Sequence, residues 1–158
     1  SDIQLVCNSF VEAKGSMFLG RGCSFPIALE GALKLKELAY VHAEGYPAGE
    51  MKHGPLALIE NGMPVVVLAP RDSYYKKTIS NMQEVIARGA KVLLITNKSK
   101  DEVYSENVWQ TIEVENASED LLPFLITIPL QKLAYYSALK KGYDIDKPRN
   151  LAKSVTVE

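Results

Sequence analysis

Hydrophobic residues in this chain gather in short continuous runs, separated by longer segments with helical spacing. The runs at 17–20, 63–70 and 91–96 are rich in β-branched and aliphatic residues, which is typical of strands covered on both faces. Residues 109–114 alternate between apolar and polar side chains, as a strand at the edge of a sheet does. We therefore predict three buried strands and one edge strand.

Apolar residues recur every three or four positions in the segments beside these runs, which predicts helices over 1–13, 24–40, 73–88 and 119–139. Gly89 follows the third segment, at a position where glycine commonly ends a helix. Strands that alternate with helices indicate a parallel sheet, because parallel neighbours need long crossover connections. The expected fold class is α/β, with a three-layer α/β/α arrangement around a doubly wound parallel sheet.

Two helix starts are indicated by the sequence. Ser24 is expected to cap the second helix, with Pro26 in its first turn. Pro123 and Pro129 are expected to interrupt the last helical segment, because proline lacks the backbone donor that a helix interior needs. Thr127 would then begin a new helix ahead of Pro129.

The chain has 158 residues, of which 47% are hydrophobic and 23% charged, which is typical of one globular domain. Residues 143–158 have no periodicity and are expected to form an irregular C-terminal arm. A net charge of −1 without a basic run argues against nucleic acid or an anionic membrane as a partner. No apolar segment is long enough to span a membrane, and no secretory signal is visible.

Cysteine and histidine are scarce. Two cysteines, Cys7 and Cys23, indicate a reducing compartment, and the cytoplasm fits. The two histidines lack a third ligand at metal-binding spacing, so no catalytic zinc and no cofactor are expected. His42 lies between Val41 and Ala43 in a strand-like run and is expected to be a buried core residue.

Charged residues concentrate between positions 29 and 59. Glu30, Lys34 and Glu37 fall on one stripe of the predicted helix over 24–40, opposite its apolar residues. A solvated helix face explains this pattern, since a pair at this spacing stabilises a helix by only ~0.2–0.5 kcal/mol. A proton donor and acceptor that act on one substrate are the alternative explanation, which composition alone favours less.

Three further segments leave both readings open. The predicted loop 45–55 carries His53, which suits proton transfer but is as consistent with a structural hydrogen bond. The turn 20–24 could hold a phosphate at a helix N-terminus, yet a tight turn also requires glycine. Cys23 could be a nucleophile beside Arg21, and Lys153 in the tail could form a Schiff base with a sugar carbonyl.

Three motifs occur in order along the chain: PIALEGALKLKE at 26–37, GEMKHGP at 49–55 and PRNLAKSVTVE at 148–158. With them the chain closely resembles, over essentially its whole length, the C-terminal sugar isomerase (SIS) module of the glutamine–fructose-6-phosphate aminotransferases, or glucosamine-6-phosphate synthases. The resemblance implies a flavodoxin-like SIS fold and the second SIS module of the isomerase half. It also implies a homodimer that makes glucosamine 6-phosphate and glutamate from fructose 6-phosphate and glutamine.

The resemblance also implies roles for individual residues. Lys34 would assist proton movement at the sugar C1 oxygen, and Glu37 would carry the proton between C1 and C2. His53 would open the sugar ring in the neighbouring subunit's site. Lys153 would form the Schiff base, with Ala152 lining the sugar.

Two parts of that family's enzyme are missing from this sequence. Ser1 stands where the glutaminase domain would need an N-terminal cysteine nucleophile, and the first SIS module, whose loop grips the sugar phosphate, is absent. We therefore expect the fragment to have little or no turnover, and we discount a phosphate site at 20–24. A non-catalytic SIS module that binds sugar phosphate and regulates a partner is the alternative; a pure sugar-phosphate isomerase and a flavodoxin-like electron carrier are less favoured.

Overall fold

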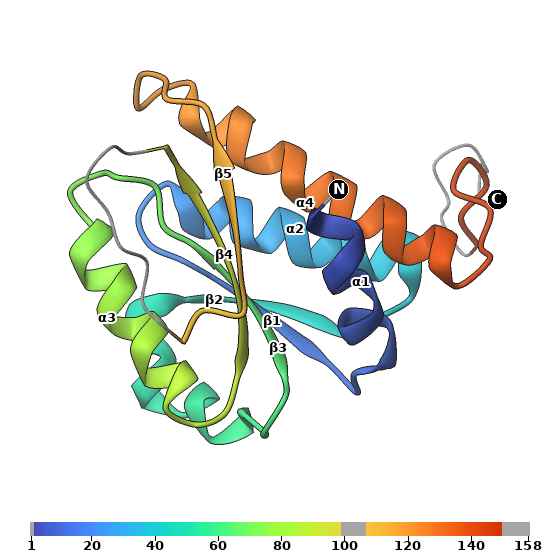
Figure 1. Ribbon diagram of the computed structural model, residues 1–158, viewed down its shortest axis with the longest axis horizontal. Helices are drawn as coiled ribbons and strands as arrows, with labels where there is room; N and C mark the ends of the chain where they lie inside the picture. Colours follow the sequence, from blue (N-terminus) through green and yellow to red (C-terminus); the bar gives the residue numbers. More distant parts are fainter. Residues whose placement is uncertain (1, 99–106, 150–158) are drawn as a thin grey trace, which may run out of the picture.

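The computed structural model describes residues 2–98 and 107–149, which form a parallel five-stranded sheet with helices on both faces (Figure 1). The strand order is β2-β1-β3-β4-β5, so the chain winds outward in both directions from β1. This is the doubly wound α/β fold predicted from the sequence. The strands are β1 (Ser16–Gly20), β2 (Ala43–Pro47), β3 (Pro64–Leu68), β4 (Lys91–Asn97) and β5 (Gln110–Val114).

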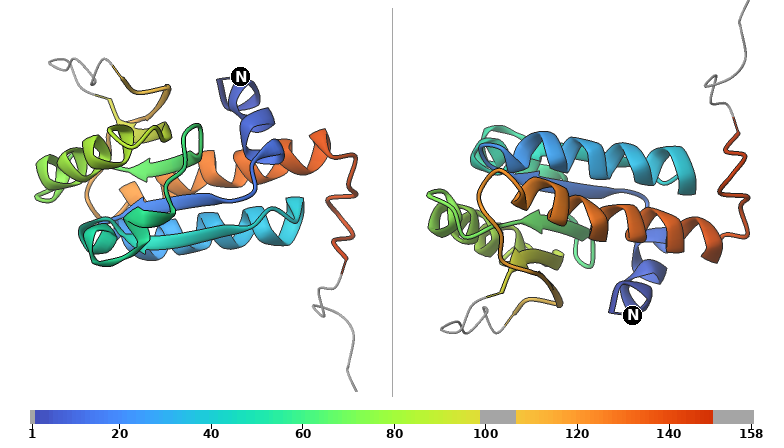
Figure 2. Two further views of the ribbon diagram at one scale, coloured as in Figure 1. Left: turned by 90° about the horizontal axis from the view of Figure 1, so that it is seen from below. Right: turned by 90° about the horizontal axis from the view of Figure 1, so that it is seen from above.

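The helices form the two outer layers. Helices α1, α2 and α4 pack on one face of the sheet, and α3 packs on the other together with two short 3-10 helices. Figure 2 shows α2 and α4 lying side by side. The bounds are α1 (Asp2–Glu12), α2 (Ser24–Ala39), α3 (Tyr75–Ile86), α4 (Leu122–Lys140), η1 (Ala48–His53) and η2 (Pro55–Leu58).

Each central strand contributes to two hydrophobic cores. Phe18 of β1 faces α2 and α4, whereas its neighbours Met17 and Leu19 face α3 and the 3-10 helices. Strands β3 and β4 alternate in the same way, because successive side chains of a strand point to opposite faces. A strand buried on both faces needs apolar residues at every position, which explains the continuous runs in the sequence.

The start of α2 differs from the prediction. Cys23 occupies the cap position with helical dihedral angles (φ −64°, ψ −19°), and Ser24 is already the first helical residue. A capping side chain normally needs an extended backbone, so neither residue makes a capping hydrogen bond. The turn can be this tight because residue 20 is glycine. A Cβ at Gly20 would lie only 2.4 Å from the backbone oxygen of Ser24.

The end of the chain also differs from the prediction, since α4 runs unbroken from Leu122 to Lys140 with Pro129 inside it. Thr127 does not begin a new helix; its hydroxyl donates to the carbonyl oxygen of Pro123 at 2.7 Å, within the same helix. Pro129 is buried. Packing of the surrounding apolar residues against α2 and the sheet outweighs the ~3 kcal/mol that an interior proline costs.

The segment after α2 is more ordered than the predicted loop. Gly45, Tyr46 and Pro47 belong to the edge strand β2, and the 3-10 helices η1 and η2 follow. The prediction for His42 was wrong: its side chain is 68% exposed. Val41 and Ala43 are buried on either side of it, and in extended backbone the residue between two buried neighbours points the other way.

In the described residues, no helix is long and apolar enough to cross a membrane.

The packing of α4 on α2 can be tested by shortening Leu130, which is 1% exposed at the contact with Gly31. Leu130→Ala is expected to lower the free energy of unfolding by about 2–5 kcal/mol, because it leaves a cavity. Leu139→Ala, on the exposed side of the same helix, should change it by less than about 0.5 kcal/mol. Urea unfolding followed by circular dichroism measures both, and equal losses would contradict this packing.

Candidate functional site

The charged stripe of α2 forms a compact cluster on the outer side of the helix. The Lys34 ammonium donates a hydrogen bond to Oε2 of Glu37 at 2.6 Å and lies 3.5 Å from Oε1 of Glu30. The Lys34 and Glu37 side chains are only 23% and 16% exposed. The opposite face of α2 is anchored in the core by Ala28, Ala32, Leu35 and Ala39, which determines how the helix is turned about its axis.

The hydrogen bond to Glu37 raises the pKa of the Lys34 ammonium, and the charge of Glu30 adds to this effect against the opposing effect of burial. Lys34 is therefore protonated at neutral pH and can donate a proton. The Glu37 carboxylate beside it accepts a hydrogen bond from this ammonium. The arrangement places an ammonium donor and a carboxylate acceptor within one hydrogen bond of each other, on the face that the sequence pattern predicted they share.

His53 lies on the other side of the sheet. It ends η1, whose Ala48 and Met51 are buried in the core next to α3. Lys52 pairs with Glu84 of α3 at 2.9 Å, which holds η1 in place. The His53 side chain is 74% exposed, with Nε2 4.0 Å from Oε2 of Glu50. One chain therefore does not bring His53 to Lys34 and Glu37.

The predicted tail residues Ala152 and Lys153 lie outside the described part of the chain. Arg149 is the last described residue. Its backbone N–H donates to the hydroxyl oxygen of Tyr40 at 2.7 Å. Tyr40 follows α2 directly, one turn beyond Glu37, so the arm is attached at the end of α2 that carries the Lys34–Glu37 pair.

The turn 20–24 borders a small cavity of about 120 Å³ at the carboxyl ends of β1 and β3. Besides Cys23 and Ser24, the carboxylates of Asp72 and Glu119 line it, and these repel an anion. The lining thus gives no support to a phosphate site there. Cys23 is exposed and unpaired.

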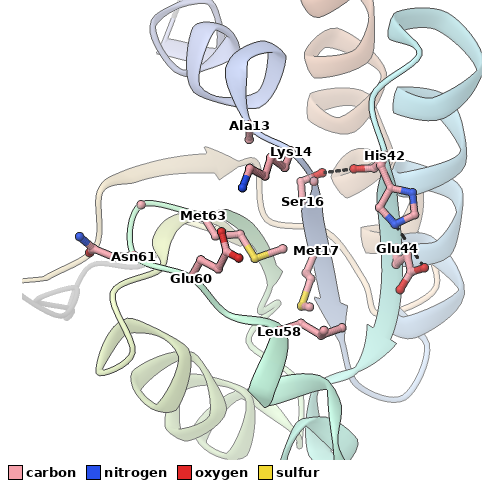
Figure 3. Close-up of a pocket in the computed structure, with 12 residues that line it drawn as sticks. Ala13, Lys14, Ser16, Met17, His42, Glu44, Leu58, Glu60, Asn61 and Met63 are labelled. Atoms are coloured by element: carbon pink, nitrogen blue, oxygen red, sulfur yellow. Dashed lines mark hydrogen bonds and ion pairs between the residues drawn. The ribbon is translucent and has the colours of Figure 1, made fainter.

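A larger cavity of about 340 Å³ opens at the amino ends of the strands, near the start of β1 (Figure 3). Of the predicted site residues that the structure describes, Lys34, Glu37 and His53, none lines it. Its rim carries His42 and Glu44, whose Nε2 and Oε1 atoms lie 3.4 Å apart, and the Tyr46 hydroxyl donates to the same carboxylate. Residues 42, 44 and 46 share one side of an extended segment, and this period-two spacing was the sequence signal that our prediction overlooked.

Within residues 2–98 and 107–149, no cluster of three histidine, cysteine or acidic side chains is placed to hold a metal ion.

Comparison with known proteins identifies relatives of the whole domain. The family model described as "SIS domain" matches residues 9–141. Glutamine–fructose-6-phosphate aminotransferase (isomerizing) from Bartonella henselae is 53% identical over 99% of this chain and 26% of its own length. The protein of the same name from Aquifex aeolicus is 52% identical over the same shares. This chain thus spans about a quarter of the length of these curated relatives.

A solved structure agrees with these relatives. The C-terminal domain of glucosamine-fructose-6-phosphate aminotransferase from Francisella tularensis superimposes with a TM-score of 0.87 at 46% identity. The match covers 92% of this chain and 41% of that one.

The effect of Glu37 on Lys34 can be tested by titration. Glu37→Gln is expected to lower the Lys34 pKa, because it removes the strongest hydrogen bond to the ammonium. Glu30→Gln, the matched control, should lower it less, since that carboxylate is more exposed and lies 3.5 Å away. NMR of the Lys34 side chain as a function of pH measures both. A larger shift in Glu30→Gln would contradict this geometry.

The raised pKa of Lys34 also predicts that the free energy of unfolding depends on pH. Because the Lys34 pKa is raised on folding above 10.5, the pair stabilises the folded chain fully at neutral pH. That contribution should be lost as the pH rises through the folded pKa, and it should be missing at all pH values in Glu37→Gln.

Proposed function

This chain belongs to the SIS domain family, and from that premise we propose that it is the C-terminal sugar isomerase module of a glutamine–fructose-6-phosphate aminotransferase. Identity of 53% over nearly the whole chain supports this assignment, as does the match to the C-terminal domain from Francisella tularensis. The observation that carries the chemistry is the Lys34–Glu37 hydrogen bond. Residues 1–158 would form a single SIS module, with 143–158 as its catalytic tail.

The proposed reaction converts fructose 6-phosphate and glutamine to glucosamine 6-phosphate and glutamate. The Lys153 amine attacks the C2 carbonyl of the open-chain sugar, and a Schiff base forms with loss of water. Ammonia, released from glutamine by a separate glutaminase module, then takes the place of the lysine at C2. A proton must finally move from C1 to C2 to produce the amino aldose.

The geometry of α2 suits this last step. Moving a proton between neighbouring carbons needs one base that takes the proton and returns it, and Glu37 is assigned that role. The oxygen on C1 changes from hydroxyl to carbonyl in the same step, so an acid–base group is needed beside it. Lys34 is assigned this task, and the hydrogen bond of 2.6 Å that holds its ammonium at the Glu37 carboxylate, on a half-buried helix face, supports the assignment.

The site is incomplete in one chain, which supports a homodimer. His53, assigned to ring opening, lies across the sheet from Lys34 and Glu37, and we propose that it serves the site of the partner subunit. Helix α4 also exposes an apolar strip, which suits contact with other modules of a longer parent chain. The strip consists of Leu121, Phe124, Ile128, Tyr135 and Leu139.

The proposed partners follow from this assignment. They are fructose 6-phosphate and glucosamine 6-phosphate, together with a glutaminase module and a first SIS module that would grip the sugar phosphate. We place the protein in the cytoplasm. The two unpaired cysteines, Cys7 and Cys23, support a reducing compartment.

The acid–base pair can be tested in the full-length parent enzyme. Glu37→Gln and Lys34→Ala are each expected to lower kcat for glucosamine 6-phosphate formation by about 10²–10⁴-fold, because each removes a general acid–base catalyst. Lys36→Ala changes an exposed lysine of the same helix and should stay close to wild type. A parent chain that binds fructose 6-phosphate equally well with and without Glu37, and never turns it over, would instead favour the regulatory module.

The role of His53 across the dimer can be tested by complementation. Parent chains carrying His53→Ala and Glu37→Gln are each expected to be nearly inactive. After subunit exchange in an equimolar mixture, activity should return to about a quarter of wild type, because half of the dimers are mixed and each of those has one intact site. If His53 instead acts within its own chain, mixing restores nothing.

A further inference from the structure

Tyr40, the residue that ends α2, has an unusual backbone conformation. Its φ of 53° and ψ of 39° place it in the left-handed region. Among the described residues it is the only non-glycine with positive φ. Glycine is the usual residue at such a helix end, because a bulky side chain is strained there. Strain of this kind persists where the surrounding structure holds it, which prompts the question of what the Tyr40 side chain does.

The Tyr40 ring holds the C-terminal arm. It packs on the Tyr143 ring, which follows α4, with centroids 4.8 Å apart. The Arg149 guanidinium lies over the Tyr40 ring at 4.1 Å and over the Tyr143 ring at 5.9 Å. The Arg149 backbone N–H also donates to the Tyr40 hydroxyl at 2.7 Å. Tyr40 and Tyr143, here named the aromatic clamp, hold the Arg149 side chain, and the Tyr40 hydroxyl also holds its backbone.

The position of the clamp along the chain matters for the proposed site. Arg149 stands four residues before Lys153, and four residues of fully extended chain span at most about 14 Å, so fixing Arg149 limits the reach of Lys153. The attachment point before the clamp is Ile145, which packs against the core eight residues ahead of Lys153. Without the clamp, eight residues instead of four would separate Lys153 from the last anchored residue. For a flexible chain, this doubling lowers the effective concentration of Lys153 at the site roughly threefold.

We propose that Arg149, held between Tyr40 and Tyr143, is a positioning residue that keeps Lys153 within reach of the sugar beside Glu37. This role rests on the proposed function. Tyr40 joins the two parts of the site physically, since it is one turn from Glu37 on α2 and contacts the arm that leads to Lys153. A glycine at position 40 would end α2 with less strain, but it would lack the ring and the hydroxyl that contact Arg149.

The substitution Tyr40→Gly separates this role from that of a helix end. Glycine adopts a φ of 53° without strain, so the helix should end as before, while the clamp is lost. Tyr40→Phe keeps the ring and removes only the acceptor of the Arg149 N–H. Arg149→Ala removes the guanidinium, and Lys147→Ala, an exposed residue of the same arm, is its matched control.

The clamp itself is tested in this chain without any assumption about function. Hydrogen exchange of the Arg149 amide should be faster in Tyr40→Gly than in wild type, because its acceptor is gone, and the melting temperature should be unchanged or higher. An unchanged exchange rate would show that Tyr40 does not hold the arm, and the proposal would fail.

The positioning role is tested in the full-length enzyme by reducing the Schiff base with borohydride, which fixes the sugar on Lys153 as a secondary amine. Tyr40→Gly and Arg149→Ala should lower the trapping rate at saturating fructose 6-phosphate at least threefold, with KM nearly unchanged. Tyr40→Phe should recover most of the rate, and Lys147→Ala should retain all of it. Wild-type trapping in Tyr40→Gly overturns the proposal.

A third outcome separates the two proposals. If wild-type enzyme shows no trapping at Lys153, the proposed chemistry fails, and the positioning role fails with it. Faster Arg149 exchange in Tyr40→Gly would still establish the clamp as a structural contact.

Discussion

The close contact between α2 and α4 over the sheet is the constraint on which the rest of the structure depends. At its centre is Gly31, where a Cβ would lie 2.9 Å from Leu130 and 3.0 Å from Phe18. Glycine lets α2 settle against both the sheet and α4, and Ala28, Ala32 and Leu35 complete the contact. A helix packed this closely cannot rotate about its axis. Its outer side, which carries Glu30, Lys34 and Glu37, is determined by the residues on its inner side.

The charged cluster on this helix affects the protonation of Lys34 more clearly than it affects stability. Partly exposed ion pairs at helical spacing contribute little to folding, on the order of 0–1 kcal/mol. What the Glu37 contact changes clearly is the protonation of Lys34, whose pKa it raises. Because a packed helix holds both groups, the ammonium donor and the carboxylate acceptor lie beside each other as the proposed function requires.

The sheet divides the proposed site between two surfaces. Lys34, Glu37 and the attachment point of the arm at Tyr40 lie on α2, whereas His53 ends a 3-10 helix packed against α3 on the opposite face. In the described part of the chain, a small cavity with two carboxylates lies at the carboxyl ends of the strands, where ligands of doubly wound folds usually bind. This separation of His53 from Lys34 and Glu37 is what the proposed function requires, in which other subunits or modules complete the site.

Local patterns in the sequence determined the fold class, the strands β1, β3, β4 and β5, the four helices and the shared face of Lys34 and Glu37. Each of these depends on spacing within one element, which the chain encodes directly. Tertiary structure alone decided that α4 continues through Pro129, that 43–47 forms an edge strand and that His53 lies across the sheet from Glu37. These outcomes depend on packing between residues far apart in the sequence, where a buried contact outweighs a local preference worth a few kcal/mol.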